Sequence, residues 1–149
     1  MSRFSLGFWR AKEWNYNSRQ LHELVNQALE LGITTIDHAD IYGQYSCENI
    51  FGNILKENPS LREKVQLVTK CGIKIATSRY PEFSMHSYDT SKAHILWSAE
   101  NYLRNLNTDY IDVLLIHRLD PLMNADEVAE AMNELKQSGK VLHFGVSNF

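Results

Sequence analysis

The stretch Tyr110–Ile116, with the sequence YIDVLLI, decides the fold class of this chain. It is short and almost continuously apolar, which is typical of a strand buried on both faces of a parallel sheet. The polar pair His117-Arg118 follows directly, and a helical pattern begins a few residues later, near Asn124. A buried strand that leads through polar residues into a helix is the repeating unit of α/β proteins.

The same unit recurs on both sides of this stretch. Helical periodicity begins near Ser18, at Ser46 or Cys47, and near Ser91, where hydroxyl side chains favour helix starts. A strand precedes each helix and another follows the last, so the order β-α-β-α-β-α-β-α-β predicts a parallel sheet with right-handed crossovers. The other expected strands are Phe4–Trp9, Ile33–Ile36, Val65–Lys70 and Val141–Val146.

Two architectures fit this order, an open doubly wound sheet and part of a (β/α)₈ TIM barrel. A complete barrel takes about 250 residues, and the chain has 149. A barrel of this length would therefore be truncated to about five βα units. The long connector 72–90 has no clear element of its own, and connectors of that length are usually functional or mobile.

Composition excludes several classes of protein. Hydrophobic residues make up 44% of the chain and charged residues 22%, which are ordinary values for a globular domain. A net charge of −3 without a basic run argues against nucleic-acid partners and against anionic membranes. No apolar run spans a bilayer and no signal-peptide core is present. Cys47 and Cys71 lack the spacing of a zinc knuckle, and we expect a cytoplasmic location.

The candidate chemistry lies where the expected strands end, because parallel α/β proteins place reactive groups at the carboxyl ends of their strands. Asp37 and Tyr42 follow the second strand, Lys70 closes the third and His117 follows the fourth. We expect Asp37 and Lys70 to pair there.

A tyrosine hydroxyl beside an ammonium group gives up its proton more easily, since the ammonium stabilises the tyrosinate. A neutral His117 could donate a hydrogen bond to a carbonyl oxygen and hold that oxygen near Tyr42. Such a site protonates an oxygen while an external hydride donor attacks the carbon, which describes carbonyl reduction.

The residues then resemble the aldo-keto reductases, over essentially the whole chain. Each motif alone is weak, but several stand in the family's order and spacing: Asp37-x4-Tyr42, Lys70 closing a strand, Leu115-Ile116-His117, and Gly145–Phe149. Residues 38–43 and 120–123 are similar to a bacterial branch of the family. The resemblance implies a (β/α)₈ barrel that binds NADPH or NADP⁺ and reduces a small aldehyde or ketone. Residues 1–149 would be its N-terminal part, without a second domain.

The resemblance also implies roles for single residues. Tyr42 would be the general acid, tuned by Lys70 and Asp37, and His117 would orient the carbonyl group. The cofactor contacts would come from Trp9, Asp37, Ser147 and Asn148, of which the last two would hydrogen-bond the nicotinamide carboxamide.

By the same resemblance, strands six to eight and most of the cofactor-binding residues are missing. The chain would then be a fragment of a longer reductase, a subunit that assembles with a partner, or a decayed remnant. Open sheet edges favour self-association. A non-catalytic interaction module therefore stays open as the alternative function.

A second alternative is a metal-dependent barrel hydrolase, with Asp37, His38, Asp40 and His117 as ligands. The short histidine pair that such enzymes carry on the first strand is absent, which disfavours it. We expect His38 to be a local hydrogen-bonding residue instead. Considered without the other residues, Asp37 and Lys70 also fit a structural ion pair at a strand end. Ser147-Asn148 likewise fits a strand end followed by a helix N-cap.

Overall fold

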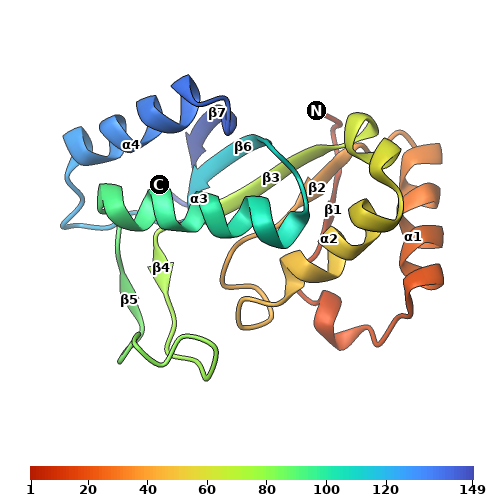
Figure 1. Cartoon of the computed structure of the whole chain (residues 1–149), viewed down its shortest axis with the longest axis horizontal. Coiled ribbons are helices and arrows are strands. Elements are labelled where there is room, and N and C mark those ends of the chain that lie inside the picture. The colour runs from red at the N-terminus through yellow and green to blue at the C-terminus, as the bar shows by residue number, and fades with distance from the viewer.

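The computed structural model describes all 149 residues and contains one five-stranded parallel sheet (Figure 1). Every neighbouring pair of strands is parallel, and the spatial order is β1-β2-β3-β6-β7. The sheet therefore keeps the chain order of its strands, as each βα unit adds one strand beside the last. The strands are β1 (Ser5–Gly7), β2 (Thr35–Asp37), β3 (Gln66–Cys71), β6 (Ile111–Ile116) and β7 (Val141–Val146).

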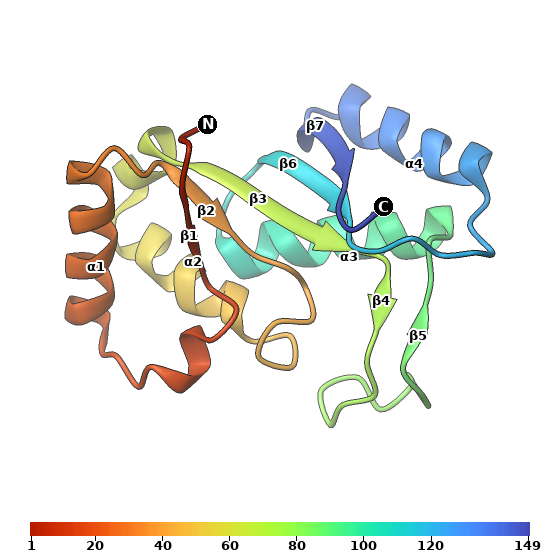
Figure 2. The same cartoon turned by 180° about the vertical axis from the view of Figure 1, so that it is seen from behind.

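All four α-helices lie on one face of this sheet, and the opposite face is uncovered (Figures 1 and 2). A doubly wound protein carries helices on both faces, whereas a TIM barrel carries them only outside. The arrangement is thus an open arc of a barrel, with β1 and β7 at its edges. The helices are α1 (Ser18–Glu30), α2 (Cys47–Glu57), α3 (Lys92–Leu106) and α4 (Ala125–Gln137).

The core lies between the sheet and the helices, in two apolar clusters. One packs α1 and α2 against the first three strands around Phe8, Ile36 and Phe51. The other packs α3 and α4 against β3, β6 and β7 around Tyr102 and Ile116. None of these helices combines the length and the hydropathy of a membrane-spanning segment.

The expectation that Tyr110–Ile116 is buried on both faces is wrong. In β6, Leu114 and Ile116 are buried against the helices, but Val113 and Leu115 stay partly exposed on the uncovered face. Alternate side chains of a strand point to opposite faces, and only one face of this sheet carries helices.

Helix starts agree closely with the sequence pattern, with one correction. The N-cap of α1 is Asn17 and not Ser18: its side chain accepts the Gln20 N–H at 3.0 Å, while the Gln20 side chain accepts the Asn17 N–H at 3.0 Å. This reciprocal capping box satisfies two free N–H groups at once. The expected caps Ser91 and Asn124 are confirmed.

The sequence pattern does not predict two 3₁₀ segments and one short hairpin, and it places the end of the first strand too late. Strand β1 ends at Gly7 rather than at Trp9, and a 3₁₀ turn, η1 (Ala11–Glu13), follows it. A second 3₁₀ segment, η2 (Pro59–Lys64), connects α2 to β3. The connector 72–90 holds an antiparallel hairpin of β4 (Ile73–Lys74) and β5 (Ser87–Tyr88).

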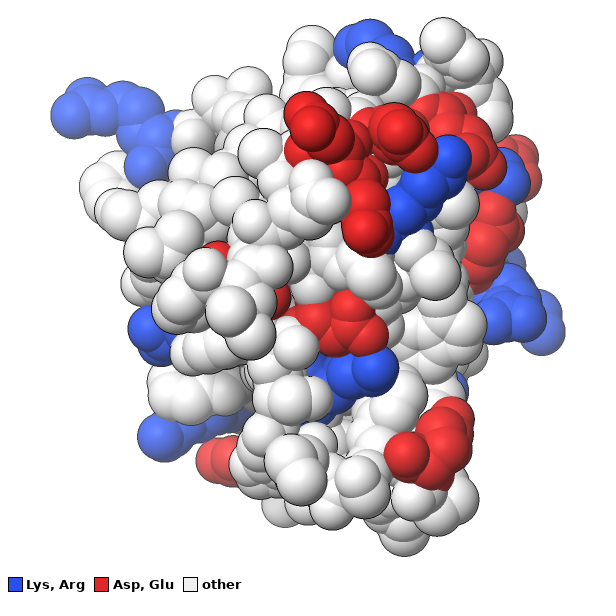
Figure 3. Space-filling model, turned by 90° about the vertical axis from the view of Figure 1, so that its left-hand side faces the viewer, with Lys and Arg blue, Asp and Glu red and all other residues white.

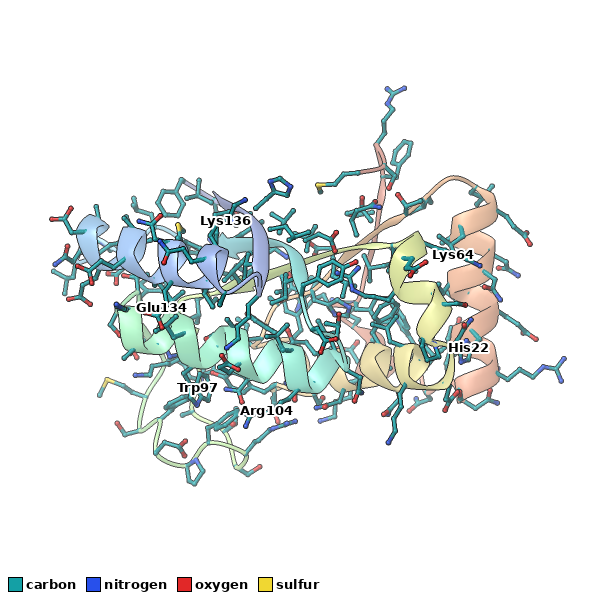
Figure 4. The ribbon with its side chains drawn as sticks, turned by 45° about the horizontal axis from the view of Figure 1, so that its top comes forward. His22, Lys64, Trp97, Arg104, Glu134 and Lys136 are labelled. Atoms are coloured by element: carbon teal, nitrogen blue, oxygen red, sulfur yellow. The ribbon has the colours of Figure 1, made fainter.

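Aromatic side chains fasten the loop of this hairpin to the body of the protein. Trp97 projects from α3 toward the loop (Figure 4) and meets Tyr80 and Phe83 at ring distances of 5.2 and 5.7 Å. Tyr45 packs edge-on against Tyr80 at 4.7 Å. Strands of two residues are too short to show periodicity in the sequence. The hairpin is therefore recognised only in the structure, through these contacts.

Candidate active site

The four residues singled out from the sequence meet at the carboxyl ends of β2, β3 and β6. Asp37 is the last residue of β2, Lys70 is the penultimate residue of β3, and His117 follows β6. The register pairs Asp37 with Val68, two residues before Lys70. Since residues two apart in a strand share a face, both side chains stand on the same face of the sheet.

Lys70 is at the centre of the arrangement. Its Nζ donates to Asp37 Oδ1 at 2.9 Å, to Asp37 Oδ2 at 2.8 Å and to the His38 carbonyl at 2.7 Å. The Tyr42 hydroxyl lies 3.4 Å from the same nitrogen. The ammonium is therefore fixed between a carboxylate and a carbonyl, with the tyrosine hydroxyl at its open side.

An unusual turn places Tyr42. The three residues after it, Gly43, Gln44 and Tyr45, all have positive φ, at 58°, 59° and 65°. Non-glycine residues adopt this region at a cost of about 1–2 kcal/mol each. The turn brings the Tyr42 carbonyl back to accept the N–H groups of Ser46 and Cys47, at 3.1 and 3.2 Å. Tyr42 is thereby tied to the start of α2.

The Tyr42 ring lies between two other rings of the site. Trp9 packs at 6.4 Å between centroids and is 63% exposed, so one side of the site is open to solvent. His117 meets Tyr42 at 6.0 Å with an interplanar angle of 79°.

His117 is held neutral by its surroundings. Burial, followed by the positive charges of Lys70 and Arg118, lowers the pKa of His117 to about 4. Its main-chain N–H donates to the Cys71 carbonyl at 2.8 Å, which orders the residue beside β3. Its Nδ1 is buried without a hydrogen-bond partner. The other ring nitrogen, Nε2, makes no hydrogen bond within the chain and is not among its fully buried unpartnered atoms.

Ser147 and Asn148 follow β7 and reach the same end of the sheet. Asn148 Nδ2 donates to the His117 carbonyl at 3.4 Å and to Ser147 Oγ at 2.8 Å. Asn148 has φ of 58°, a region that asparagine tolerates better than most residues. Both bonds use the amide nitrogen, so the Asn148 carbonyl oxygen remains available to a donor.

The structure does not assemble the four candidate metal ligands. His38 and Asp40 are buried on the side of the helices, whereas Asp37 and His117 stand with Lys70. No group of three or more His, Cys, Asp and Glu side chains in the chain could hold a metal ion. Alternation along the strand end separates the two sets.

The expectation that His38 is a local hydrogen-bonding residue is wrong for its side chain. Its ring is enclosed by Phe8 and Phe51, at 4.9 and 5.4 Å between centroids, and neither nitrogen has a partner. Burial, with a smaller contribution from Lys70, lowers the pKa of His38 to about 3. Only its main-chain carbonyl serves the site.

The sequence analysis did not predict a group of hydrogen-bonded polar residues on the helix side of β3, next to Lys70. The Tyr102 hydroxyl donates to the Lys70 carbonyl from α3. The Thr69 hydroxyl donates to Glu48 on α2 at 3.1 Å, and Asn105 donates to the same carboxyl group at 3.1 Å. In the sequence Tyr102 belongs to the apolar stripe of a helix, so no pattern marks its hydroxyl as functional.

Comparison with known proteins places the chain among related sequences and structures. The family model "Aldo/keto reductase family" matches residues 3–149. The uncharacterised oxidoreductase YcsN of Bacillus subtilis (strain 168) is 57% identical over 99% of this chain and 49% of its own length. The oxidoreductase YdhF of Escherichia coli (strain K12) is 56% identical over the same shares.

The fold is similar to that of solved structures as well. The glycerol dehydrogenase of Gluconobacter oxydans superposes with a TM-score of 0.83 at 32% identity, covering 100% of this chain and 45% of that protein. The chain thus spans about half the length of the curated relatives it matches.

Proposed function

The chain belongs to the aldo/keto reductase family, and on that premise we propose that it carries the acid-base site of an NADPH-dependent carbonyl reductase. The observation that carries this proposal is the contact of Lys70 Nζ with Asp37 and with the Tyr42 hydroxyl. A tyrosine hydroxyl beside an ammonium and at an open face is suited to protonate a substrate oxygen.

In this proposal Tyr42 is the general acid. Its hydroxyl donates a proton to the carbonyl oxygen as negative charge develops there, and Lys70 stabilises the tyrosinate that is left. Asp37 holds the ammonium in place, since it accepts from Nζ with both oxygens. Without that pairing the ammonium would be free to turn toward other acceptors.

His117 is assigned to orientation. A histidine that stays neutral at pH 7 can carry its proton on Nε2 and donate a hydrogen bond to the carbonyl oxygen. Its ring stands edge-on to Tyr42 with the ring centroids 6.0 Å apart, and we assign both donors to the same substrate oxygen. Two donors on one oxygen fix the substrate and stabilise the charge that forms.

The nicotinamide end of the cofactor fits the residues after β7. A carboxamide offers one acceptor and two N–H donors, and Ser147 and Asn148 offer a hydroxyl and a free amide oxygen. Trp9, on the other side of Tyr42, supplies an exposed aromatic surface. When bound, the reduced nicotinamide supplies the hydride. We assign no residue of this chain to the cofactor's phosphates.

The test compares the wild-type chain with Tyr42→Phe, which keeps the ring but removes the acid. NADPH binding is followed by quenching of tryptophan fluorescence, and reduction of an aromatic aldehyde by oxidation of NADPH. We expect Tyr42→Phe to bind NADPH as the wild type does and to reduce aldehydes about 10²–10⁴-fold more slowly. Equal turnover in the two proteins would overturn the acid role, and a loss of NADPH binding in Tyr42→Phe would show that the hydroxyl serves binding instead.

The edges of the sheet favour a second candidate, a non-catalytic module that acts through association. Exposed apolar side chains lie within β7 or next to the two edge strands, namely Phe4, Leu142, Val146 and Phe149. Light scattering on the same sample separates the two functions. A stoichiometric oligomer without NADPH binding would support association, whereas a monomer that binds NADPH would support catalysis.

A further inference from the structure

A cavity beside the candidate site is not used by the proposed chemistry. It has a volume of about 380 Å³ and lies between the hairpin β4–β5 and the residue that follows His117. Its lining consists of two isoleucines, three uncharged polar or aromatic side chains and one arginine: Ile73, Ile75, His86, Ser87, Tyr88 and Arg118. Arg118 directly follows His117 in the chain, and its charge lies near enough to the imidazole to help lower the pKa of His117.

Arg118 has no anionic partner in the chain. It is exposed and takes part in none of the ion pairs of the structure. No Asp or Glu lines the cavity. A guanidinium at the wall of a partly apolar cavity is a ready site for a carboxylate or phosphate, which it can bind through two parallel hydrogen bonds.

The surface on the other side of Tyr88 has the opposite character. A second hollow of about 230 Å³ is lined by Asp89, Asp120 and Glu127. Figure 3 faces this flank and shows acidic side chains gathered there, with a few basic ones between them. An anion is therefore repelled on one side of Tyr88 and attracted on the other, which gives the cavity of Arg118 its selectivity.

We infer that the cavity beside His117 binds an anionic group of the carbonyl substrate, with Arg118 as its ligand. The proposed substrate class is an aldehyde or ketone that also carries a carboxylate or phosphate. Ile73 and Ile75, which line the cavity together with Tyr88, contact the carbon skeleton between the two groups. This inference rests on the proposed function, since it assigns the substrate of the same site.

Binding is tested first, without turnover. Benzoate and inorganic phosphate are titrated into the isotopically labelled chain, and backbone amide shifts are followed by NMR. We expect shifts confined to β4, β5 and residues 117–119, and an affinity about tenfold weaker in Arg118→Gln. Arg3→Gln is the matched control, because Arg3 is also exposed and precedes β1 at the opposite end of the strands. Equal weakening in both variants would overturn the site.

Turnover then identifies the source of the anion. 4-Carboxybenzaldehyde and its methyl ester differ in one negative charge and one methyl group, so the change between variants in the ratio of their kcat/KM values reports the anion site. We expect this ratio to fall about tenfold in Arg118→Gln, to recover partly in Arg118→Lys and to stay constant in Arg3→Gln. A ratio that stays constant in Arg118→Gln, or a rise in the KM for NADPH instead, would assign the cavity to another ligand.

These measurements separate the two proposals. If the wild type reduces neither aldehyde but binds benzoate through Arg118, the anion site stands and the reductase assignment fails. If every variant reduces the ester and the acid with the same kcat/KM, the reductase assignment stands and the anion site fails.

Discussion

Lys70 and Asp37 form an ion pair in which the ammonium is the more deeply buried partner. The Lys70 side chain is 9% exposed and the Asp37 side chain 30%, although Nζ lies within 2.9 Å of both carboxylate oxygens. A buried charge depends on its partner more than an accessible charge does, because water can replace the partner only of the latter.

Removal of the carboxylate should therefore destabilise the protein more than removal of the ammonium. Asp37→Ala leaves the buried ammonium unpaired and should cost up to about 3–5 kcal/mol in the free energy of unfolding. Lys70→Met should cost less, since the remaining carboxylate contacts water and the methionine still fills the space of the lysine chain. Urea denaturation of both variants measures the order, and a larger loss for Lys70→Met would contradict it.

The same ammonium should control the protonation of His117. Burial is the main cause that lowers the pKa of His117 to about 4, and Lys70 is the next. Lys70→Met should thus raise the pKa of His117 without restoring its ordinary 6.5, because burial remains. Titration of the ring nitrogens by ¹⁵N NMR measures this change.

His94 is the control for that titration. Burial also lowers the pKa of His94 to about 4, but the neighbouring charges are Asp89 and Lys74 rather than Lys70. The pKa of His94 should stay the same in Lys70→Met. If both histidines move together, the substitution has loosened the packing and the electrostatic explanation is wrong.

Glu48 should make the protein less stable in mildly alkaline solution. Burial raises the pKa of Glu48 from its ordinary 4.5 to about 8, against the lowering effect of hydrogen bonds from Asn105 and Thr69. Between these two pH values the folded state keeps a proton that the unfolded state has lost. The free energy of unfolding should therefore fall as pH rises from about 4.5 to 8, by at most ~1.4 kcal/mol per pH unit.

Glu48→Gln should remove this part of the pH dependence. An amide is of similar shape, stays neutral and can still hydrogen-bond Thr69 and Asn105. Denaturation midpoints of both proteins at several pH values give the difference in slope. Glu130→Gln, on the exposed face of α4, should keep the wild-type slope. A Glu48→Gln variant with an unchanged slope would show that this carboxyl is ionised in the folded state.

Much of the fold is visible in the sequence because it follows from local rules. Strand β7 has the predicted bounds Val141–Val146, and the caps Ser91 and Asn124 stand where hydroxyl and amide side chains precede a helical stripe. The hairpin of β4 and β5 was missed, since its order depends on aromatic contacts with Tyr45 and Trp97 from other parts of the chain.

The candidate site was predictable for a similar reason. In a parallel sheet the carboxyl ends of all strands lie at the same end of the sheet. The polar residues Asp37, Lys70 and His117, which follow or close strands, were therefore expected to lie together there. Tyr102 and Glu48 were not predictable as parts of it. Each lies on a helix whose pattern indicates only packing. Tyr102 donates to the Lys70 carbonyl, and Glu48 accepts from Thr69, the residue before Lys70.

The amino-acid sequence by itself determined the order of strands and helices, the family, and the end of the sheet at which the candidate active-site residues lie. Those properties depend on residue periodicity and on strand direction, which are read one element at a time. Only the tertiary structure decided that all helices cover one face, that Lys70 is the buried partner of Asp37, and that Arg118 faces a cavity without an acid. Burial and pairing are properties of neighbours in space, and residues far apart in the chain provide them.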